Sequence, residues 1–233
     1  MDNISLFPLQ KYDQTVSSWI RTEDPDFNLD LLSPKFKKWH LDSFYQRHFG
    51  KLSPWNENYI LQIITKSAPN DLRSTALRLI NKFSSKNQAK GHIGYGKNFR
   101  PYSEGWIEAI ANNINLSQFE GLKYHNNNRG IAIANLHARI LPTEDVHFYN
   151  PWQVGQGYPF DNLQIAALWA GTPVYCVAKT QDCAWTLIIT PDYIGWVQSN
   201  GIASTDNAFI NTWISASTDQ LSAINKYANC DYR

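Results

Sequence analysis

The spacing of apolar residues divides the chain into a helical first half and a strand-rich second half. In the first half, apolar side chains recur three or four positions apart, which is the period of one face of an α-helix. Four helices are predicted, with starts at Ser33-Pro34, Ser53-Pro54, Pro69-Asn70 and Ser103. Residues of these types are favoured where helices begin. The Asn-rich stretch 112–128 is predicted to be exposed and to mark the boundary to the second half.

From Gly130 to Asn200 the pattern changes to short runs rich in β-branched and aromatic residues. Each run is bounded by Gly, Pro, Asn or Asp, as strands commonly are. The four clearest runs are 163–170, 172–179, 184–190 and 193–198. Short strands at a spacing of about ten residues predict a small closed barrel, because closure removes exposed sheet edges.

The predicted fold is therefore α+β, with a helical N-terminal region packed on a small β-barrel and a short helical tail. The expected domains are a helical domain over 1–128, the barrel over 129–203, and a linker helix with one further strand over 204–233. The linker helix covers 204–216 and the further strand 221–224. Since an isolated strand buries too little surface to be stable, we expect the natural protein or its relatives to continue past Arg233.

Composition argues against several classes of function. The net charge is +1 and no long run of one sign occurs, which argues against binding to nucleic acid or to an anionic membrane. No stretch approaches the roughly 18 apolar residues of a membrane span, and the N-terminus lacks the pattern of a signal peptide. The chain has no closely spaced group of His and Cys, so neither a metal ion nor another cofactor is predicted.

The cysteines Cys176, Cys183 and Cys230 are odd in number and do not predict a disulfide framework. A catalytic cysteine needs a partner histidine and a setting that lowers the pKa of its thiol. Cys183 lies between two predicted strands with no helix after it, and Cys230 lies near the end of the chain. Peptide hydrolysis by either thiol is the alternative hypothesis from the enzyme class.

One glycine-rich loop, which runs from 142 to 162, is longer than the neighbouring strands require. It places Trp152, Tyr158 and Phe160 on a backbone shaped by Gly and Pro. Aromatic side chains beside polar groups are typical of peptide and sugar recognition. The candidate substrate-binding residues are Trp152, Tyr158 and Asp161, with Asp161 expected to pair with a peptide amine. In the alternative interpretation, the aromatic residues plug the barrel end or pack against a neighbouring domain.

Several segments resemble a known family. Residues 138–143, 155–164, 168–174 and 195–197 are similar to the bacterial SH3-like domain (SH3b) of multidomain NlpC-type cell-wall cysteine peptidases. Residues 94–101, Gly-Tyr-Gly-Lys-Asn-Phe-Arg-Pro, and more weakly 31–33 and 54–55, resemble the helical N-terminal stabilising domain of the same proteins. The resemblance spans roughly residues 15–215.

In that family a second SH3-like domain and a papain-like peptidase domain follow, with the catalytic cysteine usually in Asp-Cys-Ser-Gly. The resemblance implies cleavage of peptidoglycan stem peptides next to γ-D-glutamyl residues, in the cell envelope or periplasm. No Asp-Cys-Ser-Gly occurs in this chain, and Asp182-Cys183-Ala184 lies inside the first barrel. The expected role is therefore non-catalytic binding or scaffolding. The expected partner is a stem peptide or an absent peptidase domain.

Overall fold

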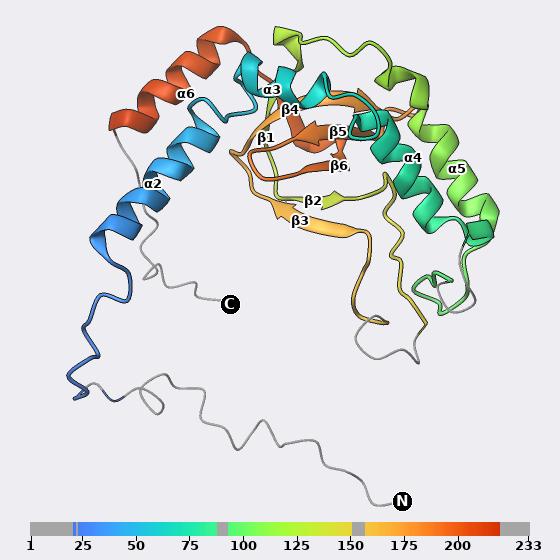
Figure 1. Ribbon diagram of the computed structural model, residues 1–233, viewed down its shortest axis with the longest axis horizontal. Coiled ribbons are helices and arrows are strands. Elements are labelled where there is room, and N and C mark those ends of the chain that lie inside the picture. Colours follow the sequence, from blue (N-terminus) through green and yellow to red (C-terminus); the bar gives the residue numbers. More distant parts are fainter. Residues whose placement is uncertain (1–20, 22, 88–92, 151–156, 220–233) are drawn as a thin grey trace, which may run out of the picture. The chain divides into compact units, whose positions relative to one another are not determined.

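The computed structural model describes residues 21, 23–87, 93–150 and 157–219 (Figure 1). The chain divides into two units between residues 43 and 44, and helix α2 (Pro34–His48) runs through this boundary. Its predicted start is confirmed, because the Ser33 hydroxyl accepts a hydrogen bond from the Phe36 amide at 3.2 Å. The predicted domain boundaries at 128 and 203 stay predictions.

The remaining α-helices of the described residues belong to the second unit. They are α3 (Glu57–Ile64), α4 (Leu72–Phe83), α5 (Glu104–Ile114) and α6 (Asn207–Asp219). Two of the predicted starts lie a few residues too early. The Asn56 side chain, and not Ser53, caps α3, and Asp71 caps α4. The Ser53 hydroxyl instead accepts from the Trp55 amide within a turn that precedes α3.

The predicted exposure of the Asn-rich stretch is wrong at two positions, Ile114 at the end of α5 and Phe119. A 3-10 helix, Leu116–Phe119, follows α5 and buries Phe119 in the core that α4 and α5 share with the sheet. Most of the other residues of this stretch are exposed or half-buried, as predicted. Two isolated apolar residues in a polar segment are too weak a signal to reveal such contacts from sequence.

The second half of the unit is an antiparallel sheet of seven strands in the order β3-β2-β6-β5-β4-β1-β7. The strands are β1 (Arg129–Ala132), β2 (Leu136–Arg139), β3 (Gln164–Leu168), β4 (Pro173–Lys179), β5 (Trp185–Ile189), β6 (Ile194–Gln198) and β7 (Ile202–Ser204). The four predicted runs correspond to β3, β4, β5 and β6. Helices and an antiparallel sheet together confirm the α+β class.

The sheet is curled. Gly201, just before β7, lies so close to Leu136 of β2 that an added Cβ would be 2.4 Å from Leu136 Cδ2. Four strands separate β2 from β7 in the sheet order, so this contact requires strong curvature. Register shifts in β2 and in β4 contribute to it, since bulges bend strands and increase their twist.

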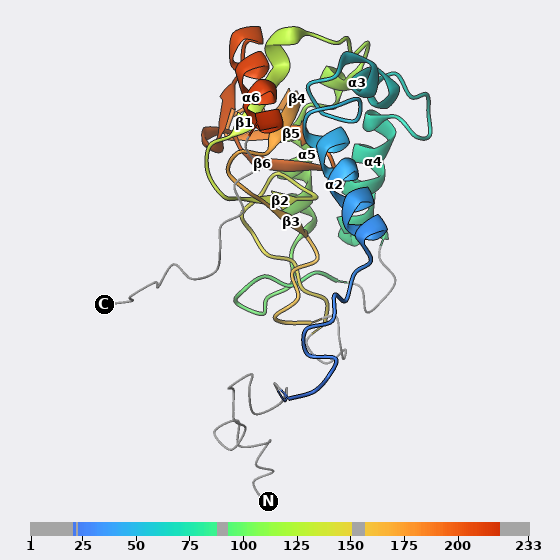
Figure 2. The same cartoon turned by 90° about the vertical axis from the view of Figure 1, so that its left-hand side faces the viewer.

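Alternate residues of the central strands supply two cores, because successive side chains in a strand point to opposite faces. Ile188 and Val197 belong to a cluster formed only by residues of the curled sheet and its turns. Leu187 and Trp196 face the other way and pack with Phe83 of α4 and with the isoleucines of α5. Figure 2 shows α3 and α4 on one side of the strands and α6 on the other. No helix in the described part of the chain has the length and apolar character of a membrane span.

A candidate binding surface formed by two loops

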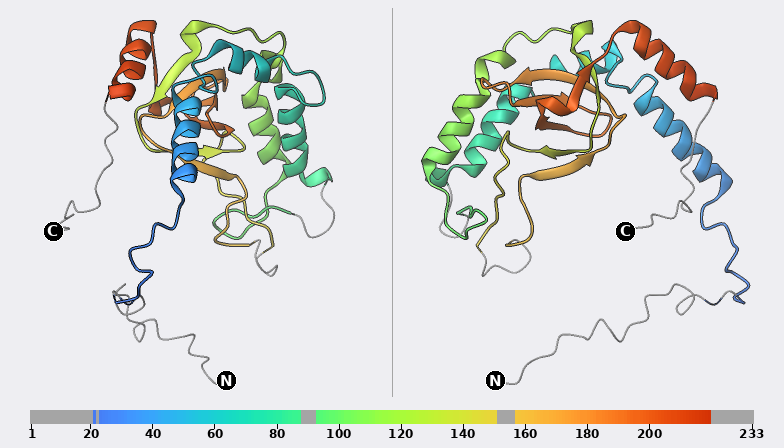
Figure 3. Two further views of the ribbon diagram at one scale, coloured as in Figure 1. Left: turned by 60° about the vertical axis from the view of Figure 1, so that its left-hand side comes forward. Right: turned by 180° about the vertical axis from the view of Figure 1, so that it is seen from behind.

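Two loops that are distant in the sequence lie side by side at one end of the curled sheet (Figure 3). One is the connector, residues 93–102, and the other is the described part of the long loop, residues 142–150 and 157–162. The Tyr95 amide donates to the Phe148 carbonyl at 2.8 Å, and the Phe148 amide donates to the Tyr95 carbonyl at 2.9 Å. The Tyr102 hydroxyl adds a bond to the Val146 carbonyl at 2.7 Å. The loops therefore form one hydrogen-bonded structure.

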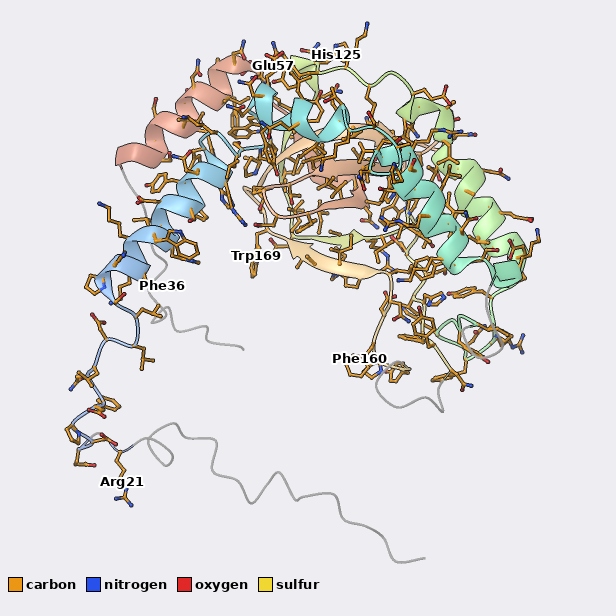
Figure 4. All side chains as sticks on the ribbon, in the orientation of Figure 1. Arg21, Phe36, Glu57, His125, Phe160 and Trp169 are labelled. Atoms are coloured by element: carbon orange, nitrogen blue, oxygen red, sulfur yellow. The ribbon has the colours of Figure 1, made fainter. Side chains whose placement is uncertain are left out.

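Among the described residues of these loops, three aromatic side chains are exposed to solvent. Phe99 of the connector is 53% exposed, and Tyr158 and Phe160 of the long loop are 64% and 60% exposed. The Tyr158 ring meets the rings of Phe99 and buried Phe148 edge-on, with centroid distances of 5.9 and 5.4 Å. Figure 4 shows Phe160 at the far end of the long loop from the strands. We call Lys97, Phe99, Arg100, Tyr158 and Phe160 the two-loop surface.

The predicted site residues occupy different environments. Trp152 lies outside the described residues, while Tyr158 belongs to the exposed surface. Asp161 points inward: its Oδ1 accepts from the amides of His147 and Leu163, both at 3.0 Å. Its Oδ2 lies 3.0 Å from Nη1 of Arg139, and these two side chains are 14% and 8% exposed. The pairing of Asp161 with a peptide amine stays a prediction, while its visible contacts hold the long loop against β2.

His147 is a buried residue of the long loop, and its ring lies against Gly94 of the connector. His147 was not singled out from the sequence. It is 1% exposed and meets the Phe83 ring edge-on at 4.8 Å, with Tyr102 and Trp106 stacked beside it. Burial lowers the pKa of His147 to about 4, although the Asp161 carboxylate acts in the opposite direction. With this pKa the ring is neutral at pH 7, and its Nδ1 lies 3.4 Å from the side-chain nitrogen of Asn162.

This neutral histidine predicts a pH-dependent stability. Between pH 6.5 and about 4 the unfolded chain binds a proton at residue 147 that the folded chain does not. The contribution of the neutral His147 ring to the free energy of unfolding is therefore fully present above pH 6.5 and is lost as the pH falls towards 4. We expect wild type to lose about 2–3 kcal/mol more unfolding free energy over this range than His147→Phe, by urea titration. His137→Gln, at an exposed histidine, should behave as wild type, and equal losses in all three proteins would contradict the assignment.

The described cysteines lie away from the two-loop surface. Cys176 is in β4, where burial raises the pKa of its thiol to about 11. Cys183 is exposed in the turn between β4 and β5, beside a hollow that is lined by residues 144, 183–185 and 198–200 and contains no histidine among the described residues. Cys230 lies outside the described residues. The described part of the chain has no group of three or more His, Cys, Asp or Glu that is arranged to hold a metal ion.

The chain was compared with known proteins. Residues 147–198 match the family model described as SH3 domain (SH3b1 type). A solved structure described as a novel NlpC/P60 endopeptidase from Photobacterium damselae subsp. piscicida is similar, with a TM-score of 0.67 and 27% identity. The match covers 87% of this chain and 43% of that endopeptidase, so the chain spans less than half of its length. None of the curated proteins compared with the chain matches it.

The matched SH3 segment begins at His147, in the long loop, and ends at the last residue of β6. It therefore contains Tyr158, Phe160 and Asp161, whereas Phe99 and its neighbours belong to the helical half. The similarity to the endopeptidase, which covers most of this chain, extends well beyond the SH3 segment. Residues 147–198 thus match an SH3 domain of the SH3b1 type, in a chain whose fold is similar to part of an NlpC/P60 endopeptidase.

Proposed function

We propose that this chain is the non-catalytic, cell-wall-binding portion of an NlpC-type peptidoglycan hydrolase. In this proposal the two-loop surface receives a peptidoglycan stem peptide. The observation that carries the proposal is the contact between the two segments with family resemblance, where the Phe99 ring of 94–101 meets the Tyr158 ring of the described part of 155–164. The two loops that carry these rings are hydrogen-bonded to each other through Tyr95 and Phe148. Rigidly held aromatic side chains bind with little loss of conformational entropy, which suits them to peptide recognition.

Titration of the 15N-labelled chain with the tetrapeptide L-Ala-γ-D-Glu-L-Lys-D-Ala tests this proposal. We expect amide shifts to be concentrated at Phe99, Tyr158 and Phe160. Because the Tyr158 ring is exposed and lies between two others, Tyr158→Ala should weaken binding about tenfold, equivalent to about 1.4 kcal/mol, without unfolding the chain. The absence of shifts in the two loops at millimolar peptide would refute the proposal.

Asp161 has a separate test, because its two oxygen atoms are already engaged. A comparison of the free peptide with its N-acetylated form measures the contribution of the peptide amine. If Asp161 binds that amine, acetylation should weaken binding to wild type and leave the affinity of a folded Asp161→Asn variant unchanged. Equal affinities of wild type for both peptides would restrict Asp161 to positioning the loop.

A second apolar surface favours domain docking as an additional role. Trp169, which lies between β3 and β4 and is labelled in Figure 4, is 71% exposed. Ile133, between β1 and β2, is 59% exposed. The Gly171 amide donates to the Ala132 carbonyl at 2.7 Å and the Ala170 amide to Asn135 Oδ1 at 3.0 Å, so the two turns are neighbours.

Trp169→Ser is the matched control for Tyr158→Ala, since it removes an exposed aromatic residue outside the two-loop surface and should leave peptide affinity unchanged.

A further inference from the structure

The connector contains a strained aromatic residue. Phe99 has a φ of +56°, in the left-handed region that bulky side chains rarely adopt. Its amide donates to the Gly96 carbonyl at 3.0 Å, and the Gly96 amide donates to the Arg100 carbonyl at 3.1 Å. These bonds close a tight turn over residues 96–100. The Phe99 ring is half exposed, so burial in a core does not account for a phenylalanine here. Strain of this kind is concentrated at sites that contact ligands.

The same turn carries two cations without a carboxylate partner. Lys97 and Arg100 are exposed, and within the described residues neither forms an ion pair. The acidic residues of the long loop are engaged elsewhere. Asp145 accepts from Trp106 Nε1 at 2.9 Å, Asp161 pairs with Arg139, and Glu144 accepts from Gln198. The turn therefore presents positive charge that no described carboxylate neutralises, next to exposed aromatic rings.

We infer that the turn 96–100 binds the carboxylates of an acidic peptide. Arg100 and Lys97 pair with the carboxylate groups, and Phe99 packs against the peptide beside Tyr158. Guanidinium and ammonium groups form their strongest hydrogen bonds with ionised acceptors, and the guanidinium fork matches the geometry of a carboxylate. This inference rests on the proposed function and adds to it the ligand's required charge and three residues that lie outside the SH3 segment.

The charge requirement is tested with one peptide in two forms. L-Ala-γ-D-Glu-L-Lys carries free carboxylates on the glutamyl residue and at the C-terminus, and its diamide carries neither. We expect calorimetry at low salt to show at least tenfold tighter binding of the acid form, with a preference that shrinks as salt is added. Lys97→Met/Arg100→Met should bind both forms equally. Lys66→Met/Arg78→Met removes the same charge from the segment 66–78 and should retain the preference.

The outcomes separate the inference from the function on which it rests. Equal affinities of wild type for acid and diamide would overturn carboxylate recognition and leave stem-peptide binding in place. Absence of binding for both forms would overturn both proposals. A preference for the acid that survives Lys97→Met/Arg100→Met would place carboxylate recognition elsewhere and would also overturn the inference.

Strain at Phe99 is tested by Phe99→Asn, because asparagine tolerates a positive φ far better than phenylalanine. We expect the urea midpoint of unfolding to rise while affinity for the acid peptide falls at least fivefold. The matched control is Phe160→Asn, which removes an exposed phenylalanine whose φ is not positive. This control should not raise the midpoint. A lower midpoint for Phe99→Asn, or an unchanged affinity, would contradict the assigned role of Phe99.

Discussion

Asp161→Ala is expected to destabilise the chain by about 3–5 kcal/mol, among the largest effects of any single substitution in the described structure. The change leaves the Arg139 guanidinium buried without its carboxylate partner and removes the acceptor of two backbone amides. A buried charge without a partner costs more than the pair contributed, because its lost hydration is no longer compensated. Urea unfolding followed by tryptophan fluorescence measures the loss.

The control for this prediction is an ion pair at the surface. Asp192 pairs with Arg47, but both side chains are about half exposed, so Asp192→Ala should cost less than about 1 kcal/mol. The double variant Asp161→Ala/Arg139→Met should be more stable than Asp161→Ala alone, since it removes the unpaired charge as well. If Asp161→Ala and Asp192→Ala are equally stable, burial of the pair does not determine its contribution.

Gly94→Ala is expected to cost about 3 kcal/mol, at the upper end of the range for overpacked sites. An added Cβ would lie 2.0 Å from Nε2 and 2.3 Å from Cδ2 of His147. The imidazole ring has no space to retreat, because Phe83, Tyr102, Trp106 and Tyr149 surround it. Thermal and urea unfolding should both show the loss.

Gly105→Ala provides a matched control for this substitution. Its added Cβ would have only the Ser103 hydroxyl within 4 Å, at 3.7 Å, and Gly105 lies in the first turn of α5, where alanine is well tolerated. Wild-type stability or a small gain is expected. Because the clash is with the ring, Gly94→Ala/His147→Ala should lose less than the sum of the single variants. Strict additivity would show that the two residues do not interact.

The elements that were predicted well are those specified by local signals. The strands β3 to β6 are bounded by turn residues and rich in β-branched side chains, so their positions follow from short-range preferences. β7, with three residues, is too short to show a period, and it forms because β1 offers it an edge. The start of α3 was misplaced because Ser53-Pro54 serves equally well as a turn, and only the structure shows that Asn56 caps the helix.

The candidate site was predicted only in part, because long-range contacts decide its chemistry. Glycine-flanked Tyr158 was correctly singled out as an exposed aromatic residue. Asp161 has the same local setting, yet its carboxylate is drawn inward by Arg139, 22 positions earlier in the chain, and nothing in the local sequence reveals that pair. The left-handed backbone of Phe99 and the burial of His147 depend on the packing of the two loops, which no periodic pattern encodes.

The reciprocal bonds between Tyr95 and Phe148 have a consequence for how this architecture is inherited. Three of the five residues of the two-loop surface belong to a stretch some fifty positions upstream of the SH3 segment. An SH3 segment transplanted alone into another protein would lose Phe99, both cations and the two backbone hydrogen bonds between Tyr95 and Phe148. Under the proposed function, a gene fusion that keeps stem-peptide binding must carry the helical half as well, so we expect the two halves to be inherited together.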